Sequence, residues 1–268
     1  MKNQTLVGCM AMALSGYFSG CGAASASSTS TLDNNVTMQG GQWEYVVTPD
    51  NGGTTMYLGV NLTKTNVDFN ANNLVIFQPS QISLVQNTAP ISCGGYSLMG
   101  AIGGTKFDGE LGTPTGAFGS FSGQLSSNGQ SISNGKYSGQ ACATVPSKVT
   151  GTLSGYTVAP LNGTFTGKLT NSAGGTSVMT VSFNQHADFS IGITGTFVEN
   201  GVTTSFADMA GTDSSLISGA SLAFGVDTVN VNGKSQYSGM GHWNPTATQI
   251  DLYLAGANES IVGTLTKQ

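Results

Sequence analysis

The sequence contains no arginine, and charged residues make up only 8% of its 268 residues, against about 25% in typical soluble proteins. Eight basic residues, all lysine, stand against 13 acidic ones, which gives a formal net charge of −5. A nucleic-acid-binding surface needs clustered Lys and Arg to neutralise phosphates, and anionic lipids attract the same residues. The composition therefore argues against nucleic acid as a partner and does not favour an anionic lipid surface.

Motifs for catalysis and for cofactors are missing as well. The chain has no G-x-S-x-G, H-E-x-x-H, P-loop or EF-hand sequence, the short patterns that carry a known chemistry. Enzymes need a few well-placed ionisable groups, and this chain has only two histidines. We expect a protein that is not an enzyme and that has no cofactor and no metal site.

An apolar stripe with helical periodicity is not found beyond the N-terminus. From residue 41 onward, apolar and polar residues alternate in short runs bounded by Gly, Asn, Ser or Asp, as in "QWEYVVT" and "SVMTVSFN". This alternation predicts half-buried antiparallel strands, with tight turns at 50–53 and 126–130. Glycines inside strands, as in "GTLSG" and "GTFTG", indicate a sheet that bends on itself. The predicted fold class is all-β, an antiparallel meander of about 14 to 18 short strands that closes into a β-barrel or a barrel-like sandwich.

The chain also repeats itself. Trp43 aligns with Phe165, and the tripeptide GGT at 52–54 aligns with GGT at 174–176, both at an offset of 122. Chance similarity between strands rich in Gly and Thr is the alternative explanation. We predict two related β halves, at 39–160 and 161–268.

The N-terminus has the pattern of an export signal. Lys2 precedes an uncharged run from Leu6 to Phe18, which is too short for a permanent membrane helix. The small residues before Cys21 resemble the lipobox of bacterial lipoproteins, which implies that residues 1–20 are a signal peptide and that Cys21 is lipidated. Residues 21–38, rich in Ser, Thr, Ala and Asn, would form a flexible tether. The resemblance implies a lipid anchor in the cell envelope, at the outer membrane; the alternative is an ordinary signal peptide and a secreted protein.

Two cysteines remain for the folded part of the chain, Cys93 and Cys142. In an exported protein such a pair is expected to form a disulfide. Closing a loop of about 50 residues would stabilise the fold by roughly 4 kcal/mol in the loop-entropy model. Free buried thiols are the alternative, and a zinc site is less favoured because the spacing is too long.

The stretch "GGQWEYV" places Gly41 and Trp43 at the start of the first predicted strand, which resembles the G-x-W signature of lipocalins. In that family an arginine on the last strand packs over the Trp, and this sequence has no arginine. Over its whole length the chain resembles Gly/Thr-rich, lipocalin-like bacterial lipoproteins of uncharacterised function. That resemblance implies a barrel-like fold and an envelope location, and it brings no established activity with it.

Three polar groups are candidates for chemistry or binding. "HADFS" places His186, Asp188 and Ser190 on one face of a strand, but Asp is in the middle where a catalytic triad needs His, so a polar turn is the better interpretation. Asp108 and Glu110 would lie about 6.6 Å apart on one face, near the separation of glycosidase carboxylates. A solvated face is the favoured alternative.

The best binding candidate is "GHWNP", with His242, Trp243 and Asn244. An exposed Trp beside His and Asn could stack on a sugar ring while the polar groups bind its hydroxyls. The favoured interpretation is that Trp243 is a core residue at a strand end, like Trp43. Trp43 is also among the candidate ligand-binding residues.

The sequence thus favours a lipid-anchored envelope β-protein that is not an enzyme and that binds a small apolar ligand or serves a structural or interaction role. The alternative is a surface carbohydrate-binding or weak hydrolytic module. A membrane-spanning barrel is disfavoured because clear aromatic girdles are missing. A closed barrel with an apolar interior would support the first hypothesis, and Trp243, Asp108 and Glu110 converging in a cleft would support the second.

Overall fold

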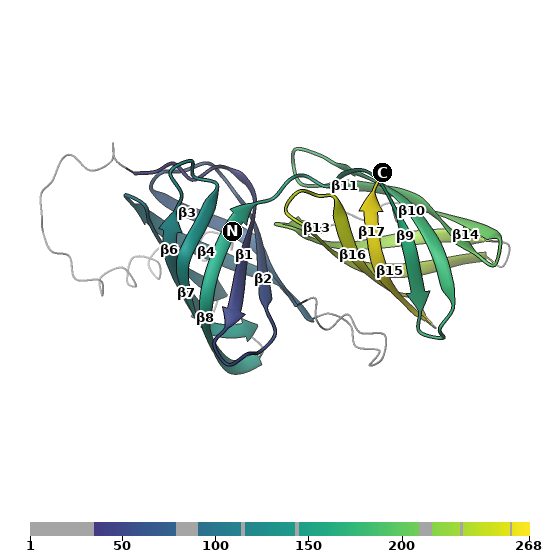
Figure 1. Ribbon diagram of the computed structural model, residues 1–268, viewed down its shortest axis with the longest axis horizontal. Coiled ribbons are helices and arrows are strands. Elements are labelled where there is room, and N and C mark those ends of the chain that lie inside the picture. The colour runs from purple at the N-terminus through teal and green to yellow at the C-terminus, as the bar shows by residue number, and fades with distance from the viewer. Residues whose placement is uncertain are drawn as a thin grey trace, which may run out of the picture. The chain divides into compact units, whose positions relative to one another are not determined.

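The computed structural model describes residues 35–78, 91–113, 116–142, 145–208, 216–230, 233–257 and 259–268. The predicted signal peptide, Cys21 and most of the predicted tether lie outside this part of the chain. Within it, all seventeen elements are β-strands (Figure 1). A membrane-crossing helix, one both long and apolar enough, is not found within the described residues.

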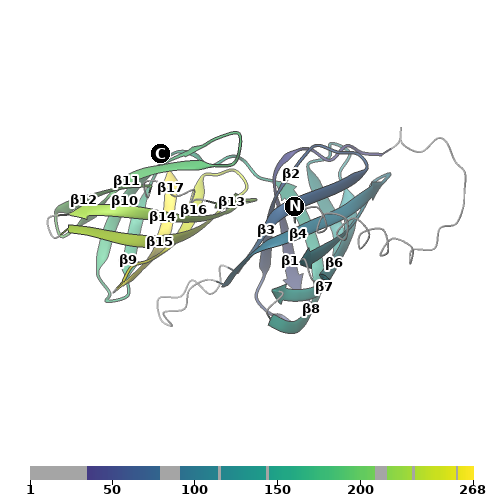
Figure 2. The same cartoon turned by 180° about the vertical axis from the view of Figure 1, so that it is seen from behind.

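The first eight strands form a closed antiparallel barrel in which each strand pairs with the next and β8 pairs back with β1 (Figure 2). The closing pair runs from Trp43 opposite Thr157 to Pro49 opposite Gly151. The strands of this first barrel are β1 (Gly41–Pro49), β2 (Met56–Leu62), β3 (Asp68–Gln78), β4 (Ile91–Gly103), β5 (Lys106–Thr113), β6 (Gly116–Leu125), β7 (Ser131–Cys142) and β8 (Val145–Thr157).

The remaining nine strands form a second barrel, in which the paired strands are again antiparallel. The first strand, β9, pairs with the last, β17, and β12 pairs with β14, so eight strands close a ring while the short β13 pairs with one end of β14. These strands are β9 (Asn162–Asn171), β10 (Thr176–Gln185), β11 (Ile191–Glu199), β12 (Val202–Asp208), β13 (Leu216–Ser218), β14 (Ser221–Asn230), β15 (Gly233–Trp243), β16 (Gln249–Ala255) and β17 (Ser260–Lys267). The prediction of an all-β antiparallel meander that closes into a barrel is confirmed.

Alternating side chains of each strand fill the interior of its barrel. In the first barrel, Phe107 lies at the centre of an aromatic cluster, with ring centroids 4.9 Å from Phe69, 5.2 Å from Phe121 and 5.7 Å from Tyr45. Tyr45 stacks in turn on Trp43. The centre of the first barrel is therefore packed with aromatic rings.

The second barrel has its own core, in which aliphatic residues such as Leu252 and Ile193 surround smaller aromatic contacts. Phe165 meets Phe183 edge to face, with centroids 5.6 Å apart. Trp243 is fully buried in this core, as Trp43 is in the first. Each barrel thus contains one of the two tryptophans.

The last residues of the predicted tether, 35–38, belong to the fold of the first barrel. Met38 is fully buried in the first core, its backbone pairs with Thr65, and the Val36 amide donates to the Gly104 carbonyl. Residues 35–38 are therefore part of the folded barrel. Asn35 hydrogen-bonds there, and Val36 and Met38 pack against the core. The sequence prediction rested on the composition of the whole segment 21–38, in which these few residues do not stand out.

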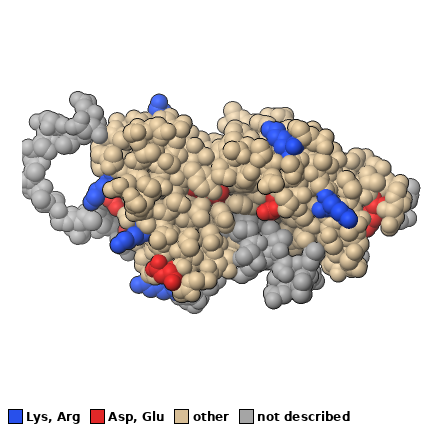
Figure 3. Space-filling model, in the orientation of Figure 1, with Lys and Arg blue, Asp and Glu red and all other residues tan. Residues whose placement is uncertain are grey.

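Charged side chains are few and scattered over the face of the protein drawn in Figure 3. The two polar turns expected from the sequence connect strands of the first barrel, at 50–53 between β1 and β2 and at 126–130 between β6 and β7. Gly52 and Gly129 adopt positive φ in these turns, the conformation that favours glycine. The predicted turn chemistry is confirmed at both places.

Candidate functional site

Residues 42–45 of strand β1 are buried on both faces of the strand. Trp43 and Tyr45 point into the first barrel, and the period-two alternation of a strand makes Gln42 and Glu44 point outward. Those two outward side chains are nevertheless only 4% and 0% exposed. They are buried because they contact the second barrel, where Gln42 Nε2 donates to the Gly219 carbonyl at 2.7 Å.

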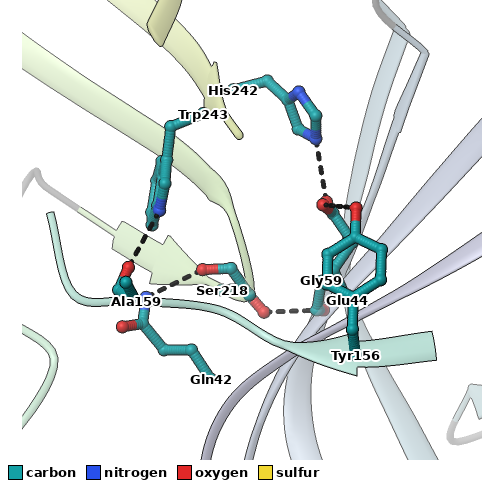
Figure 4. A network of polar contacts seen from close by, with 9 residues as sticks. Gln42, Glu44, Gly59, Tyr156, Ala159, Ser218, His242 and Trp243 are labelled. Carbon is teal, nitrogen blue, oxygen red and sulfur yellow. Dashed lines mark hydrogen bonds and ion pairs between the residues drawn. The ribbon is translucent and has the colours of Figure 1, made fainter. Parts of the chain in front are cut away.

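Glu44 lies in the polar network that joins the two barrels (Figure 4). His242 Nε2 on β15 lies 2.9 Å from Glu44 Oε1, and the Tyr156 hydroxyl on β8 donates to Oε2 over 3.1 Å. An ionised carboxylate only accepts hydrogen bonds, so the imidazole donates through Nε2. A buried carboxylate is costly unless it is hydrogen-bonded and paired, and His242 and Tyr156 meet that need.

A second set of contacts brings the two backbones close together beside Glu44. Ser218 at the end of β13 donates its hydroxyl to the Gly59 carbonyl at 2.7 Å, and Asn61 donates to the Ile217 carbonyl at 2.9 Å. A side chain at Gly59 on β2 would overlap the Ser218 carbonyl oxygen. Gly219, which adopts a φ of +58°, lies against the backbone of Gly59. Glycine at both positions makes this close approach possible.

A pocket of about 260 Å³, which we call the junction pocket, opens beside this network. Pockets for drug-sized ligands measure roughly 300 to 1,000 Å³, so this one suits a small molecule or one terminal group of a larger molecule. Its lining includes residues of both barrels: Tyr57, Tyr156, His242, Asn244, Gln249 and Asp251.

The wall of the junction pocket combines rings with a carboxylate. The Tyr57 ring packs on the His242 imidazole with centroids 4.4 Å apart and a tilt of 56°. Asp251 on β16 lies directly opposite His242 in the strand register, and its Oδ1 accepts a hydrogen bond from the Thr264 hydroxyl. A carboxylate has about four acceptor sites, so Asp251 keeps capacity for a ligand.

Two tyrosines in the lining of the junction pocket have raised pKa values. The pKa of Tyr57 is raised by burial first and then by the charges of Glu44 and Asp251. The pKa of Tyr156 is raised further, by burial and by the charge and the hydrogen bond of Glu44. In both cases burial is the larger cause, and the charge of Glu44 adds to it.

Three of the four candidate ligand-binding residues, His242, Trp243 and Asn244, line the junction pocket, and Trp43 does not. His242 lies in the pocket wall as described, and Asn244 lies beside it, where its Oδ1 accepts the Thr248 amide at 2.8 Å. Asn244 therefore shapes the turn after β15 and presents only part of its amide to the pocket.

Both tryptophans are buried, which agrees with the favoured interpretation of Trp243 as a core residue, and neither exposes a ring face for stacking. Trp43 and Trp243 are both 0% exposed. Each indole N–H donates to a backbone carbonyl, of Gln39 at 2.8 Å and of Ala159 at 3.2 Å. These rings are core residues, because a large aromatic side chain at an inward position of a barrel strand fills the interior.

The candidate catalytic groups lie apart from the junction pocket. In the turn between β10 and β11, Asp188 Oδ1 accepts hydrogen bonds from the Ser190 amide at 3.1 Å and hydroxyl at 2.7 Å, and these bonds lower the pKa of Asp188. The sequence "HADFS" is thus a polar turn, as favoured. Asp108 and Glu110 are exposed on the outer face of β5, opposite Ser122 and Ser120.

Glu110 also lines a shallow depression of about 430 Å³ on the outside of the first barrel, with Phe118 and Lys148. Asp108 does not line it. The two carboxylates and Trp243 therefore do not converge in one cleft.

The predicted disulfide is present. Cys93 on β4 and Cys142 on β7 are bonded, with Cα atoms 6.0 Å apart. Among the described residues, no group of three or more His, Cys, Asp or Glu side chains is placed to hold a metal ion. The predicted lipidation site, Cys21, lies outside the described residues.

Sequence reasoning missed Glu44, Tyr57, Tyr156 and Asp251. One signal was available for Glu44. At the repeat offset of 122 it corresponds to Thr166, so a charge stands where the related strand has a neutral residue. The three other residues sit at ordinary outward positions of strands, where nothing in the pattern distinguishes them.

No protein-family model and no curated protein sequence matches the chain. Two solved structures share features with it. The isotype 1 transferrin binding protein B from serogroup B Neisseria meningitidis aligns with 87% of this chain and 76% of its own, at 8% identity and a TM-score of 0.27. A protein of unknown function of the DUF3598 family from Nostoc punctiforme aligns with 90% of this chain and all of its own, at 10% identity and a TM-score of 0.24. At these scores the likenesses carry no argument about function.

Proposed function

We propose that this protein is a binding protein of the bacterial cell envelope, without enzymatic activity, held by a lipid on Cys21, and that its junction pocket takes a small polar ligand. One observation carries the proposal. The pocket gathers a histidine, two tyrosines and a carboxylate beside a fully buried glutamate, where two barrels meet. A small number of placed polar groups in a concave site is typical of ligand-binding pockets.

A small apolar ligand inside a barrel is supported less well. The first barrel is filled at its centre by the rings around Phe107, and the second holds a core of 23 buried residues. Side chains in contact in this way leave few voids larger than a water molecule. The polar surface at the junction offers the better site.

The anchor is tested by intact mass spectrometry of the protein purified from a bacterial membrane fraction, compared with a Cys21→Ser variant. We expect acyl mass on Cys21 and release of the variant as soluble protein, because two or three acyl chains hold a protein on a membrane essentially for good. A mature wild-type chain without lipid would make the protein a secreted one.

The pocket is tested by blocking it. Gln249 is exposed and lines the junction pocket, so Gln249→Trp should fill it without disturbing a core. Gln236→Trp is the matched control, because Gln236 is exposed on β15 about 20 Å along the strand from His242. The probes are a panel of neutral, cationic and anionic monosaccharides.

A ligand present at 100 times its Kd stabilises the folded protein by about 2.7 kcal/mol. We expect at least one probe to raise the thermal unfolding temperature of the wild type and of Gln236→Trp, and not of Gln249→Trp. Equal responses of all three proteins would overturn the assignment of the site.

A further inference from the structure

The charges around the junction pocket are unbalanced. Asp251 lines it and Glu44 lies directly behind His242 and Tyr156, whereas none of the described residues that line it is a lysine. The chain has no arginine to supply the missing charge. Among the described lining residues His242 is therefore the one basic group, against Asp251 in the lining and Glu44 behind it.

The remaining lining groups also suit a cation. The face of an aromatic ring attracts a cation within about 6 Å of its centroid, and Tyr57 places its ring at the pocket wall against His242. The phenol oxygen of Tyr57 and the carboxylate of Asp251 are acceptors. An ammonium group has three donors and no acceptor, so it complements such a lining.

Other ligand classes fit less well. An anion would be repelled by the Asp251 carboxylate in the lining and by Glu44 behind it. An apolar group would bury polar atoms without replacing their hydrogen bonds, which costs free energy. A neutral sugar could bond to the same oxygens, but it would not balance the carboxylates.

We infer that the junction pocket takes a small organic cation, recognised through a protonated amine that is held between Asp251 and the Tyr57 ring with Glu44 behind. This inference rests on the proposed function, since it names the chemical class of the ligand at the same site. The amine would form charge-assisted hydrogen bonds, which are about twice as strong as neutral ones.

The test compares glucosamine with glucose, two probes that share a ring and differ in the amine. The readout is the imidazole signals of the two histidines in nuclear magnetic resonance spectra of the full-length chain, below the pKa of the glucosamine amine. His242 lies in the pocket, and His186 lies on an exposed turn of the same protein. His186 is therefore an internal control.

We expect glucosamine to shift the His242 signals saturably, with at least tenfold higher affinity than glucose, and to leave His186 unchanged. Asp251→Asn removes the charge and keeps the shape, and it should cut the preference for glucosamine at least fivefold. Glu44→Gln likewise removes a charge and keeps the shape, and it should also lower the preference for glucosamine. Asp108→Asn, on the exposed face of β5, should change nothing.

Higher salt should weaken glucosamine binding and leave glucose binding unchanged, because screening acts on charge. Equal affinities for the two sugars, insensitive to Asp251→Asn, would overturn the inference and leave the proposed function standing. If neither probe shifts His242, the cation assignment fails. If, in addition, no probe of the panel distinguishes Gln249→Trp from the wild type, the proposed function fails with it.

Discussion

Strands β1 and β9 begin the two barrels at corresponding places. Their inward faces are alike, but their outward faces make different contacts. On the inward face, Trp43 and Phe165 are both fully buried in their own cores. On the outward face, Glu44 reaches across to His242, whereas Thr166 hydrogen-bonds to Thr180 in its own barrel at 3.1 Å. The inward pattern specifies that a barrel forms, and the outward residues decide what the barrel contacts.

The barrels also differ in what stabilises them and in one added element. The first has a disulfide and an aromatic cluster around Phe107, whereas the second has the additional short strand β13. β13 supplies Ser218 to the contact with Gly59. Four changes to the chain test this comparison.

The largest effect is expected in the aromatic cluster. Phe107→Ala should lower the free energy of unfolding by about 3 to 5 kcal/mol for the cavity, and Phe165→Ala by a similar amount. Phe107 touches three aromatic rings within 6 Å, whereas Phe165 meets Phe183. At roughly 0.5 to 1.5 kcal/mol for each extra pair, Phe107→Ala should cost about 1 to 3 kcal/mol more. Urea unfolding of both variants measures this, and equal losses would contradict the difference between the cores.

Removal of the disulfide should separate the stabilities of the two barrels. Replacing Cys93 and Cys142 by Ser frees a loop of about 50 residues, which should cost roughly 4 kcal/mol in the loop-entropy model. The loss should fall on the first barrel alone. Because each barrel holds one Trp, fluorescence of variants with a single Trp follows each unfolding transition. A shift of the same size in both transitions would show that the barrels unfold as one unit.

A side chain at Gly59 should disturb the contact between the barrels and not the barrels themselves. Gly59→Val should cost about 1 to 3 kcal/mol, as overpacking does, because the backbone of Ser218 lies where the side chain would go. The control is Gly103→Val, at an exposed strand position with open space around it, which should stay within about 0.5 kcal/mol of the wild type. The His242 imidazole signal should move only in Gly59→Val. An unchanged signal there would mean that the contact does not depend on this glycine.

The smallest effect has the opposite sign. The Tyr45 hydroxyl is buried without a hydrogen-bond partner among the described residues, and burial raises its pKa. Tyr45→Phe should therefore stabilise the first barrel by about 1 kcal/mol, as thermal unfolding would measure. At the repeat offset the second barrel has Gly167, so it offers no such gain. A loss of stability in Tyr45→Phe would reveal a bound water at the hydroxyl.

Strands, turns, barrel closure and the disulfide could be predicted because each depends on local pattern or on elimination among few cysteines. The network at the junction could not. His242 and Glu44 are 198 residues apart in the chain, and a period-two pattern assigns Glu44 to solvent when a second barrel covers it. The three residues of β13 are too few to show any period. His242 and Asn244 were singled out from their residue types, and Trp243 was favoured as a core residue, which its burial on β15 confirms.

The pairing of β9 with β17 has a consequence for the order in which the protein is made. The first barrel can close as soon as β8 is available to pair with β1. The second cannot close before the residues around Lys267, which pairs with Phe165, have left the ribosome and any export channel. Until then β9 has an open edge, and such edges pair readily with other chains. The first barrel would already be folded during that interval. Its outward Gln42 and Glu44 would therefore lack their partners in the second barrel until that barrel closes.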